Sequence, residues 1–107
     1  MGLIENLERM LEAGQDGPLL RFSLGGAYLR AGDYAQAALH LERALIQEPQ
    51  FSAAWKLYGR ALTDLGRRED AIHVYEKGVR VAEERGDKQA AREMVVFLKR
   101  LRRESGD

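Results

Sequence analysis

The chain has 107 residues, and its 17 lysines and arginines balance its 17 aspartates and glutamates. A neutral chain creates no overall field that would attract nucleic acid or a membrane surface, and no apolar run approaches the roughly 18 residues of a membrane span. The absence of cysteine excludes disulfides, thiolate metal sites and cysteine nucleophiles, and it is typical of a cytoplasmic protein. We therefore expect one cytoplasmic domain over residues 1–107, large enough to bury roughly two-thirds of its unfolded surface.

The first predicted helix covers residues 3–13. Its apolar residues recur at helical spacing on one face, while charged residues occupy the remainder. That apolar face consists of Leu3, Ile4, Leu7, Met10 and Leu11. Gly14 ends the helix, and Pro18 suits the first turn of the next helix because its missing N–H is not needed there.

Four further helices are predicted over residues 18–31, 34–48, 53–65 and 68–84. Gly32 and Gly66 mark the turn inside each successive pair, where a helix commonly ends in a left-handed residue. Asp33 and Ser52 are expected to cap the helices that follow them by accepting backbone N–H bonds. Pro49 ends the helix over 34–48, because the residue before a proline disfavours the helical conformation.

A last helix is predicted over residues 88–103, after Gly86 and Asp87 as stop and cap. Its apolar face holds Ala91, Met94, Val95, Leu98 and Leu101. Cations crowd its C-terminal end, where the helix dipole favours them; they are Lys99, Arg100, Arg102 and Arg103.

A pattern of small and large apolar residues occurs twice at a fixed offset along the chain. The segment Leu24-Gly25-Gly26-Ala27-Tyr28 corresponds to Tyr58-Gly59-Arg60-Ala61-Leu62, and Ala37, Leu41 and Ala44 correspond to Ala71, Tyr75 and Gly78. Small residues at these places let two helix axes approach closely, and the large ones fill the space between them. The offset is a period of 34, which indicates repeats of two antiparallel helices.

These residues resemble the tetratricopeptide repeat, which places a bulky and then a small residue in its first helix and favours a tryptophan where Trp55 lies. Arg21 and Glu83 depart from that pattern, at a tryptophan place and a proline place. The resemblance implies an all-α solenoid of about six helices, with repeats over 18–51 and 52–85 and a closing helix over 86–104. Two repeats are fewer than the usual minimum of about three, so the helices over 3–13 and 88–103 are expected to close the ends.

No catalytic constellation, metal-ligand spacing or nucleotide loop is found, so we predict a protein that is not an enzyme and uses no cofactor. The two histidines, His40 and His73, are expected on the surface or at a groove edge, in separate layers.

The resemblance further implies a concave groove lined by the first helix of each repeat. Places that face a ligand in the family fall here on Leu19, Phe22, Gly26, Leu29 and Arg30, and on Ala53, Lys56, Arg60, Thr63 and Asp64. From these we select as partner-binding candidates Leu19, Phe22, Leu29, Arg30, Lys56 and Arg60. The alternative is that the apolar ones pack against helix 3–13 and that Lys56 and Arg60 belong to a solvated face.

One branch of the family clamps the C-terminal carboxylate of chaperones with two lysines, two asparagines and an arginine. The matching places here hold Phe22, Gly26, Leu57, Asp87 and Ala91, so that clamp is absent.

The predicted function is therefore a non-enzymatic adaptor that binds a peptide or protein segment in the groove. Two alternatives stay open. One is a structural homodimer that uses helix 3–13 or the closing helix. The other is a nucleic-acid accessory acting through the basic C-terminus, which a steep loss of binding with salt would reveal, although no aromatic residues interleave with the cations. Helix 3–13 can cap the stack, lie in the groove or pair with a second copy.

Overall fold

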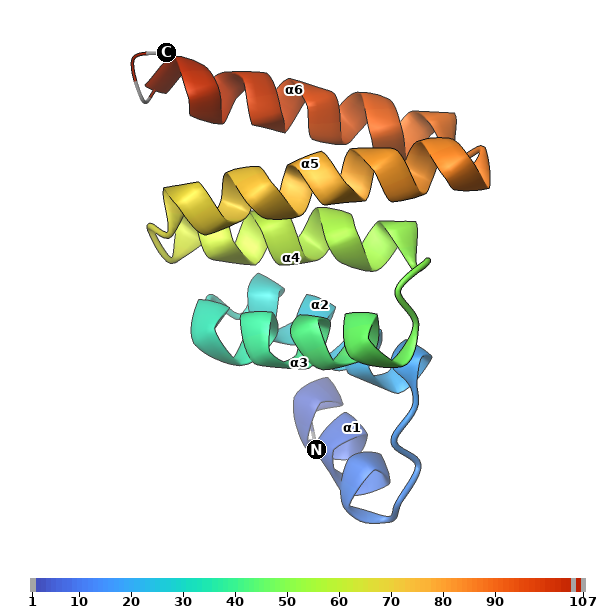
Figure 1. Cartoon of the computed structure of the whole chain (residues 1–107). Coiled ribbons are helices and arrows are strands. Elements are labelled where there is room, and N and C mark those ends of the chain that lie inside the picture. Colours follow the sequence, from blue (N-terminus) through green and yellow to red (C-terminus); the bar gives the residue numbers. More distant parts are fainter. Residues whose placement is uncertain (1, 105, 107) are drawn as a thin grey trace.

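A computed structural model describes residues 2–104 and 106, and within them the chain forms six helices (Figure 1). They are α1 (Leu3–Glu12), α2 (Pro18–Arg30), α3 (Tyr34–Gln47), α4 (Ser52–Asp64), α5 (Arg68–Arg85) and α6 (Lys88–Glu104). The predicted all-α repeat fold is confirmed. Every predicted helix is present, with each end within one residue of its predicted position.

Local chemistry places these ends. Gly32 and Gly66 have φ angles of +81° and +79°, a region that side chains with a Cβ rarely adopt. Asp33 accepts a hydrogen bond from the backbone N–H of Gln36 at 3.2 Å, so it caps α3 as predicted. Backbone chemistry and the hydrophobic pattern thus agree on the turn between α2 and α3.

The predicted cap of α4 was wrong. Phe51 holds the N-cap position and Ser52 is already the first helical residue. The Ser52 hydroxyl instead donates a hydrogen bond of 2.8 Å to Asp87, which in turn caps α6 by accepting from the N–H of Ala90. The serine was expected to accept from nearby backbone N–H groups, but its hydroxyl donates a hydrogen bond to a carboxylate far along the chain.

The helices stack in two layers. α4 packs against both α2 and α6, so α2, α4 and α6 form one layer, while α1, α3 and α5 belong to the other. The stack is elongated, with principal extents of 45 × 28 × 19 Å, and α1 and α6 lie at its two ends (Figure 1). We call the surface presented by α2, α4 and α6 the first-helix face.

A glycine allows the two helices of each pair to approach closely. A Cβ built on Gly25 would lie 2.4 Å from Cγ of Leu41, and one built on Gly59 would lie 2.3 Å from Cε1 of Tyr75. Leu41 is fully buried and Tyr75 almost so. The two contacts are one period apart, which is the close approach that the repeated pattern predicted.

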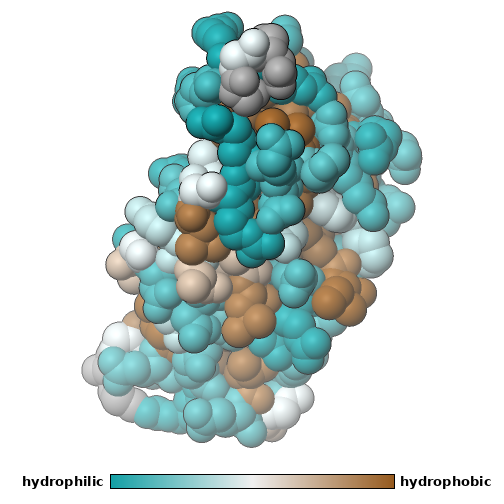
Figure 2. All heavy atoms as spheres, turned by 60° about the vertical axis from the view of Figure 1, so that its left-hand side comes forward, coloured by the Kyte–Doolittle hydropathy of each residue, from teal (hydrophilic) through white to brown (hydrophobic). Residues whose placement is uncertain are grey.

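Helix α1 packs on α2 at one end of the stack. Yet none of its residues is fully buried, and Leu3 and Met10 remain 56% and 42% exposed. On the face shown in Figure 2, apolar side chains reach the surface as separate patches among polar ones. Among the described residues, no helix has the length and apolar character needed to cross a membrane.

Candidate functional site

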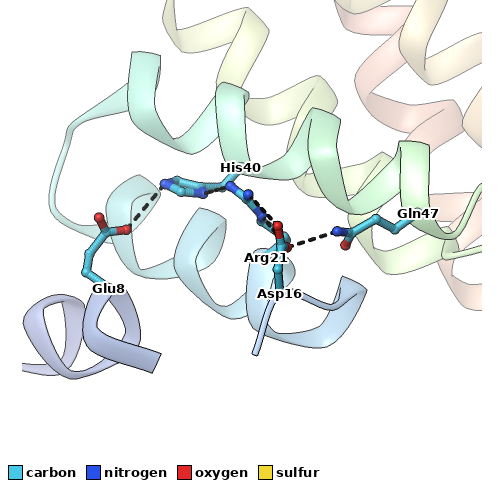
Figure 3. A network of polar contacts seen from close by, with 5 residues as sticks. All are labelled: Glu8, Asp16, Arg21, His40 and Gln47. Carbon is cyan, nitrogen blue, oxygen red and sulfur yellow. Dashed lines mark hydrogen bonds and ion pairs between the residues drawn. The ribbon is translucent and has the colours of Figure 1, made fainter. Parts of the chain in front are cut away.

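A polar network ties the loop after α1 to α2 and α3 (Figure 3). Arg21 donates two hydrogen bonds of 2.8 Å to the two carboxylate oxygens of Asp16, and Gln47 donates one of 2.9 Å to the same carboxylate. These charge-assisted bonds hold the pKa of Asp16 well below its usual range, with Arg21 as the largest cause.

His40 lies inside this network, and its predicted place on the surface was wrong. Its side chain is almost fully buried, with the ring stacked on Tyr28 at a centroid distance of 5.5 Å. Nδ1 lies 3.0 Å from a guanidinium nitrogen of Arg21, and Nε2 lies 3.5 Å from Oε1 of Glu8 (Figure 3). Because arginine can only donate, Nδ1 accepts and the neutral ring carries its proton on Nε2, directed at Glu8. Burial lowers the pKa of His40 and favours this neutral form.

The repeat contained a signal for this burial. His40 lies one period before Val74, which is packed against the core. Arg21 lies one period before Trp55, whose indole N–H donates a hydrogen bond of 2.8 Å to the carbonyl of Pro49. Arginine and tryptophan therefore hold equivalent places, and each reaches back to the segment before its helix. The network therefore has a structural role: it fastens the loop after α1 to α2 and α3.

The predicted partner-binding residues are divided over the first-helix face. Phe22 and Arg30 line one hollow of about 330 Å³, which also involves α1 and α4. Its other lining residues are Leu3, Leu7, Ser23, Gly26 and Leu57. Leu19 is exposed on the first turn of α2, and Leu29 is half-buried against the core; neither lines this hollow.

The hollow has an apolar floor and a cation at its edge. A Cβ on Gly26 would meet the Arg30 guanidinium at 3.5 Å and Leu57 at 3.7 Å, so the glycine leaves open the space between them. The ring of Phe22 packs against the ring of Phe51, at a centroid distance of 4.7 Å. No acidic partner of Arg30 is found among residues 2–104. The arrangement is suited to an apolar side chain with a carboxylate nearby.

Lys56 and Arg60 already have acidic neighbours. Nζ of Lys56 lies 3.1 Å from Glu93 on α6, and Nε of Arg60 lies 3.3 Å from Asp64 on the next turn of α4. Arg60 lines a second, smaller hollow of about 180 Å³ between α4, α5 and α6, together with Tyr75 and others. Burial raises the pKa of Tyr75 to about 12, so its phenol stays protonated.

The basic end of α6 does not line the hollow that holds Phe22 and Arg30. Arg102 forms an ion pair with Glu76 of α5. Lys99, Arg100 and Arg103 are exposed in the last turns of the helix. Arg100 also lines the second hollow, whose acidic lining residues Asp64 and Glu104 balance its two arginines.

Comparison with known proteins gives one consistent family. A family model described as "Tetratricopeptide repeat" matches residues 28–94, and another of the same description matches residues 4–50. The TPR repeat-containing protein PA0015 of Pseudomonas aeruginosa is 50% identical over 101 residues, which are 94% of this chain and 96% of that protein.

Solved structures agree in fold. The solution structure of protein BPP2914 from Bordetella parapertussis has a TM-score of 0.86 and 42% identity, covering 97% of this chain and 90% of that one. The second TPR domain of human RPAP3, solved in complex with the HSP70 peptide SGPTIEEVD, has a TM-score of 0.77 and 28% identity, covering 92% of this chain and 78% of that one. A structural relative of this fold therefore binds a peptide.

Proposed function

Because the chain belongs to the tetratricopeptide repeat family, we propose that it is a non-enzymatic interaction module that binds a peptide or protein segment on its first-helix face. One observation carries the proposal: the hollow lined by Phe22, Gly26 and Leu57 has the Arg30 guanidinium at its edge. Apolar pockets with a few convergent polar groups are the usual form of a binding site.

The chemistry of the hollow defines the segment that it accepts. An aliphatic or aromatic side chain enters over Gly26, and an aspartate or glutamate next to it meets Arg30. Arginine holds a carboxylate through two parallel hydrogen bonds, which fixes the orientation of the segment as well as its charge. Recognition of this kind differs from the family's chaperone clamp, whose places are occupied here by Phe22, Gly26, Leu57, Asp87 and Ala91.

The other candidate residues take secondary roles. Leu19 extends the apolar surface at the start of α2, and Leu29 supports it from the core side. Lys56 and Arg60 are already neutralised by Glu93 and Asp64, so they contribute less to a bound acid than Arg30 does.

A displayed library of random nine-residue peptides tests the proposal whatever the natural partner is. We expect selection to enrich peptides with a large apolar residue beside an acid. Gly26→Leu fills the hollow from a position whose Cβ has only ordinary contacts, so the fold is kept while binding falls by about tenfold or more. Arg30→Glu is expected to lose the acidic preference, with Arg80→Glu, an exposed site on α5, as the matched control.

Two further variants separate the parts of the face. Phe22→Ala should weaken binding strongly, because truncating a packed anchor typically costs about 2 kcal/mol or more. The double change Lys56→Glu and Arg60→Glu should act mainly at low salt. The proposal is overturned if selected peptides bind the Gly26→Leu and Arg30→Glu proteins as well as they bind the wild type. It is also overturned if neutralising Lys99, Arg100, Arg102 and Arg103 alone abolishes capture.

A further inference from the structure

Helix α1 matches the second helix of a repeat, and no helix among the described residues stands in the place of its first helix. Leu3, Leu7 and Met10 precede Ala37, Leu41 and Ala44 by one period, and Ala71, Tyr75 and Gly78 follow by another. In α3 this stripe is completely buried, with Leu41 against Gly25 of α2. In α5 it is buried as well, with Tyr75 against Gly59 of α4.

In α1 the same stripe has no helix to cover it within the described chain. Leu3 is 56% and Met10 is 42% exposed, whereas their counterparts Ala37 and Ala44 are not exposed at all. Beside it on α2 runs a second stripe at helical spacing, namely Leu19, Ser23, Gly26 and Arg30. Leu3 and Leu7 share the hollow with the last three of these. We call the space between the two stripes the slot; the corresponding place in each of the two repeats holds a first helix of 13 residues.

We propose that the partner segment binds in this slot as an amphipathic α-helix that takes the place of a first helix beside α1. This inference rests on the proposed function and specifies the conformation of the bound segment. Repeat continuity supports it, because α2 and α4 occupy the corresponding places beside α3 and α5. Completing the repeat would remove Leu3, Met10 and Leu19 from water, which is the main gain available to the complex.

The side chains of the slot specify the sequence of that helix. Leu7 matches Leu41 and Tyr75, so the residue that faces it must be small, as Gly25 and Gly59 are. In the second repeat Trp55 faces Gly78, its Cβ 2.9 Å from where a glycine Cβ would lie. Met10 of α1 corresponds to Gly78 but is large, so the residue of the bound helix that faces it must be small. The bound helix therefore carries two small residues four positions apart.

Charge defines the other end of the helix. The slot walls are uncharged except for Arg30 at the last residue of α2, for which no acid is found in the described range. First helices of successive repeats run in the same direction, so Arg30 lies near the C-terminus of the bound helix. An aspartate or glutamate five residues after the second small residue completes the interaction.

A peptide copied from this chain tests the geometry directly. The probe has the sequence of residues 18–31 with Arg21→Ala and Arg30→Glu, acetylated and amidated. It offers alanine to Met10, Gly25 to Leu7 and a glutamate to Arg30. The control peptide carries Gly25→Leu in addition. We expect the probe to bind the protein below about 1 mM and to gain helical circular dichroism on binding, and the control to bind about tenfold more weakly.

Two protein variants separate this inference from the proposed function. Met10→Glu lies outside the hollow and should weaken binding of the probe by about tenfold, whereas Leu39→Glu, at an exposed apolar site on α3, should not. The inference is overturned if the probe does not bind, if the control peptide binds equally, or if peptides selected from the library ignore Met10→Glu and stay extended. In that last case the proposed function stands alone. A wild-type dimer that Met10→Glu dissociates would show that a second copy fills the slot, and would also overturn the inference.

Discussion

The contact between Gly59 and Tyr75 gives a sharp test of the packing. In Gly59→Ala the new methyl carbon would stand 2.3 Å from Cε1, 2.6 Å from Cζ and 2.7 Å from Cδ1 of the tyrosine ring. The ring is almost completely buried, so it cannot move into solvent. The two helices must therefore separate, or the ring must leave its preferred rotamer.

A second glycine serves as control for the change in helix propensity. Replacing a glycine inside a helix by alanine favours folding by about 1 kcal/mol, while overpacking a core costs about 1–3 kcal/mol. Gly26 also lies inside a helix, but its Cβ would meet its neighbours only at 3.5 and 3.7 Å. We expect Gly26→Ala to raise the free energy of unfolding, and Gly59→Ala to lie about 1–3 kcal/mol below it.

Urea and thermal unfolding followed by circular dichroism measure this difference. In a chain of this size about 1 kcal/mol corresponds to about 4 °C, so the two variants should differ in melting midpoint by about 4–12 °C. Gly59→Leu should be less stable still. Equal midpoints for Gly59→Ala and Gly26→Ala would refute the close approach of α4 and α5.

Three other predictions concern the contacts between α1, α2 and α3. Burial lowers the pKa of His40 in the folded state, so its contribution to the free energy of unfolding is fully present above the ordinary value of about 6.5 and is lost as the pH falls. Urea unfolding should therefore give a lower free energy of unfolding at pH 5 than at pH 7, and this difference should be smaller in His40→Gln. The pKa of Asp16 is also lowered, so its contribution disappears as the pH falls below about 4, and Asp16→Asn should flatten the acid limb of the same profile. Deleting residues 1–14 uncovers α2 and should either lower the melting midpoint or change the mass in solution, whereas a truncated chain with wild-type values of both would show that α1 closes nothing.

Most of the fold was accessible from the sequence because local and repeated signals coincide. Gly32, Asp33 and Pro49 each determine a helix end through backbone chemistry that acts within a few residues. Gly25 packs against Leu41, and one period later Gly59 packs against Tyr75. These equivalent contacts determine how closely the helices of each pair approach.

Side-chain partners distant in the chain were not accessible in this way. Ser52 donates to Asp87 and Lys56 pairs with Glu93, in both cases because α6 is displaced relative to the period by the longer α5. The burial of His40 depends on Arg21, which departs from the family pattern at a tryptophan place. The hollow itself depends on how α1 docks, since Leu3 and Leu7 supply one wall.

The position of a bound peptide on the protein is the measurement that tests the proposed function most directly. Amide NMR spectra of the chain would be recorded during titration with the tightest-binding peptide from the library. We predict that the largest shifts fall on Ser23, Gly26 and Leu57 around the hollow, and that Arg30→Glu suppresses them. Shifts confined to the basic end of α6, or to the exposed surface of α3 and α5, would contradict it.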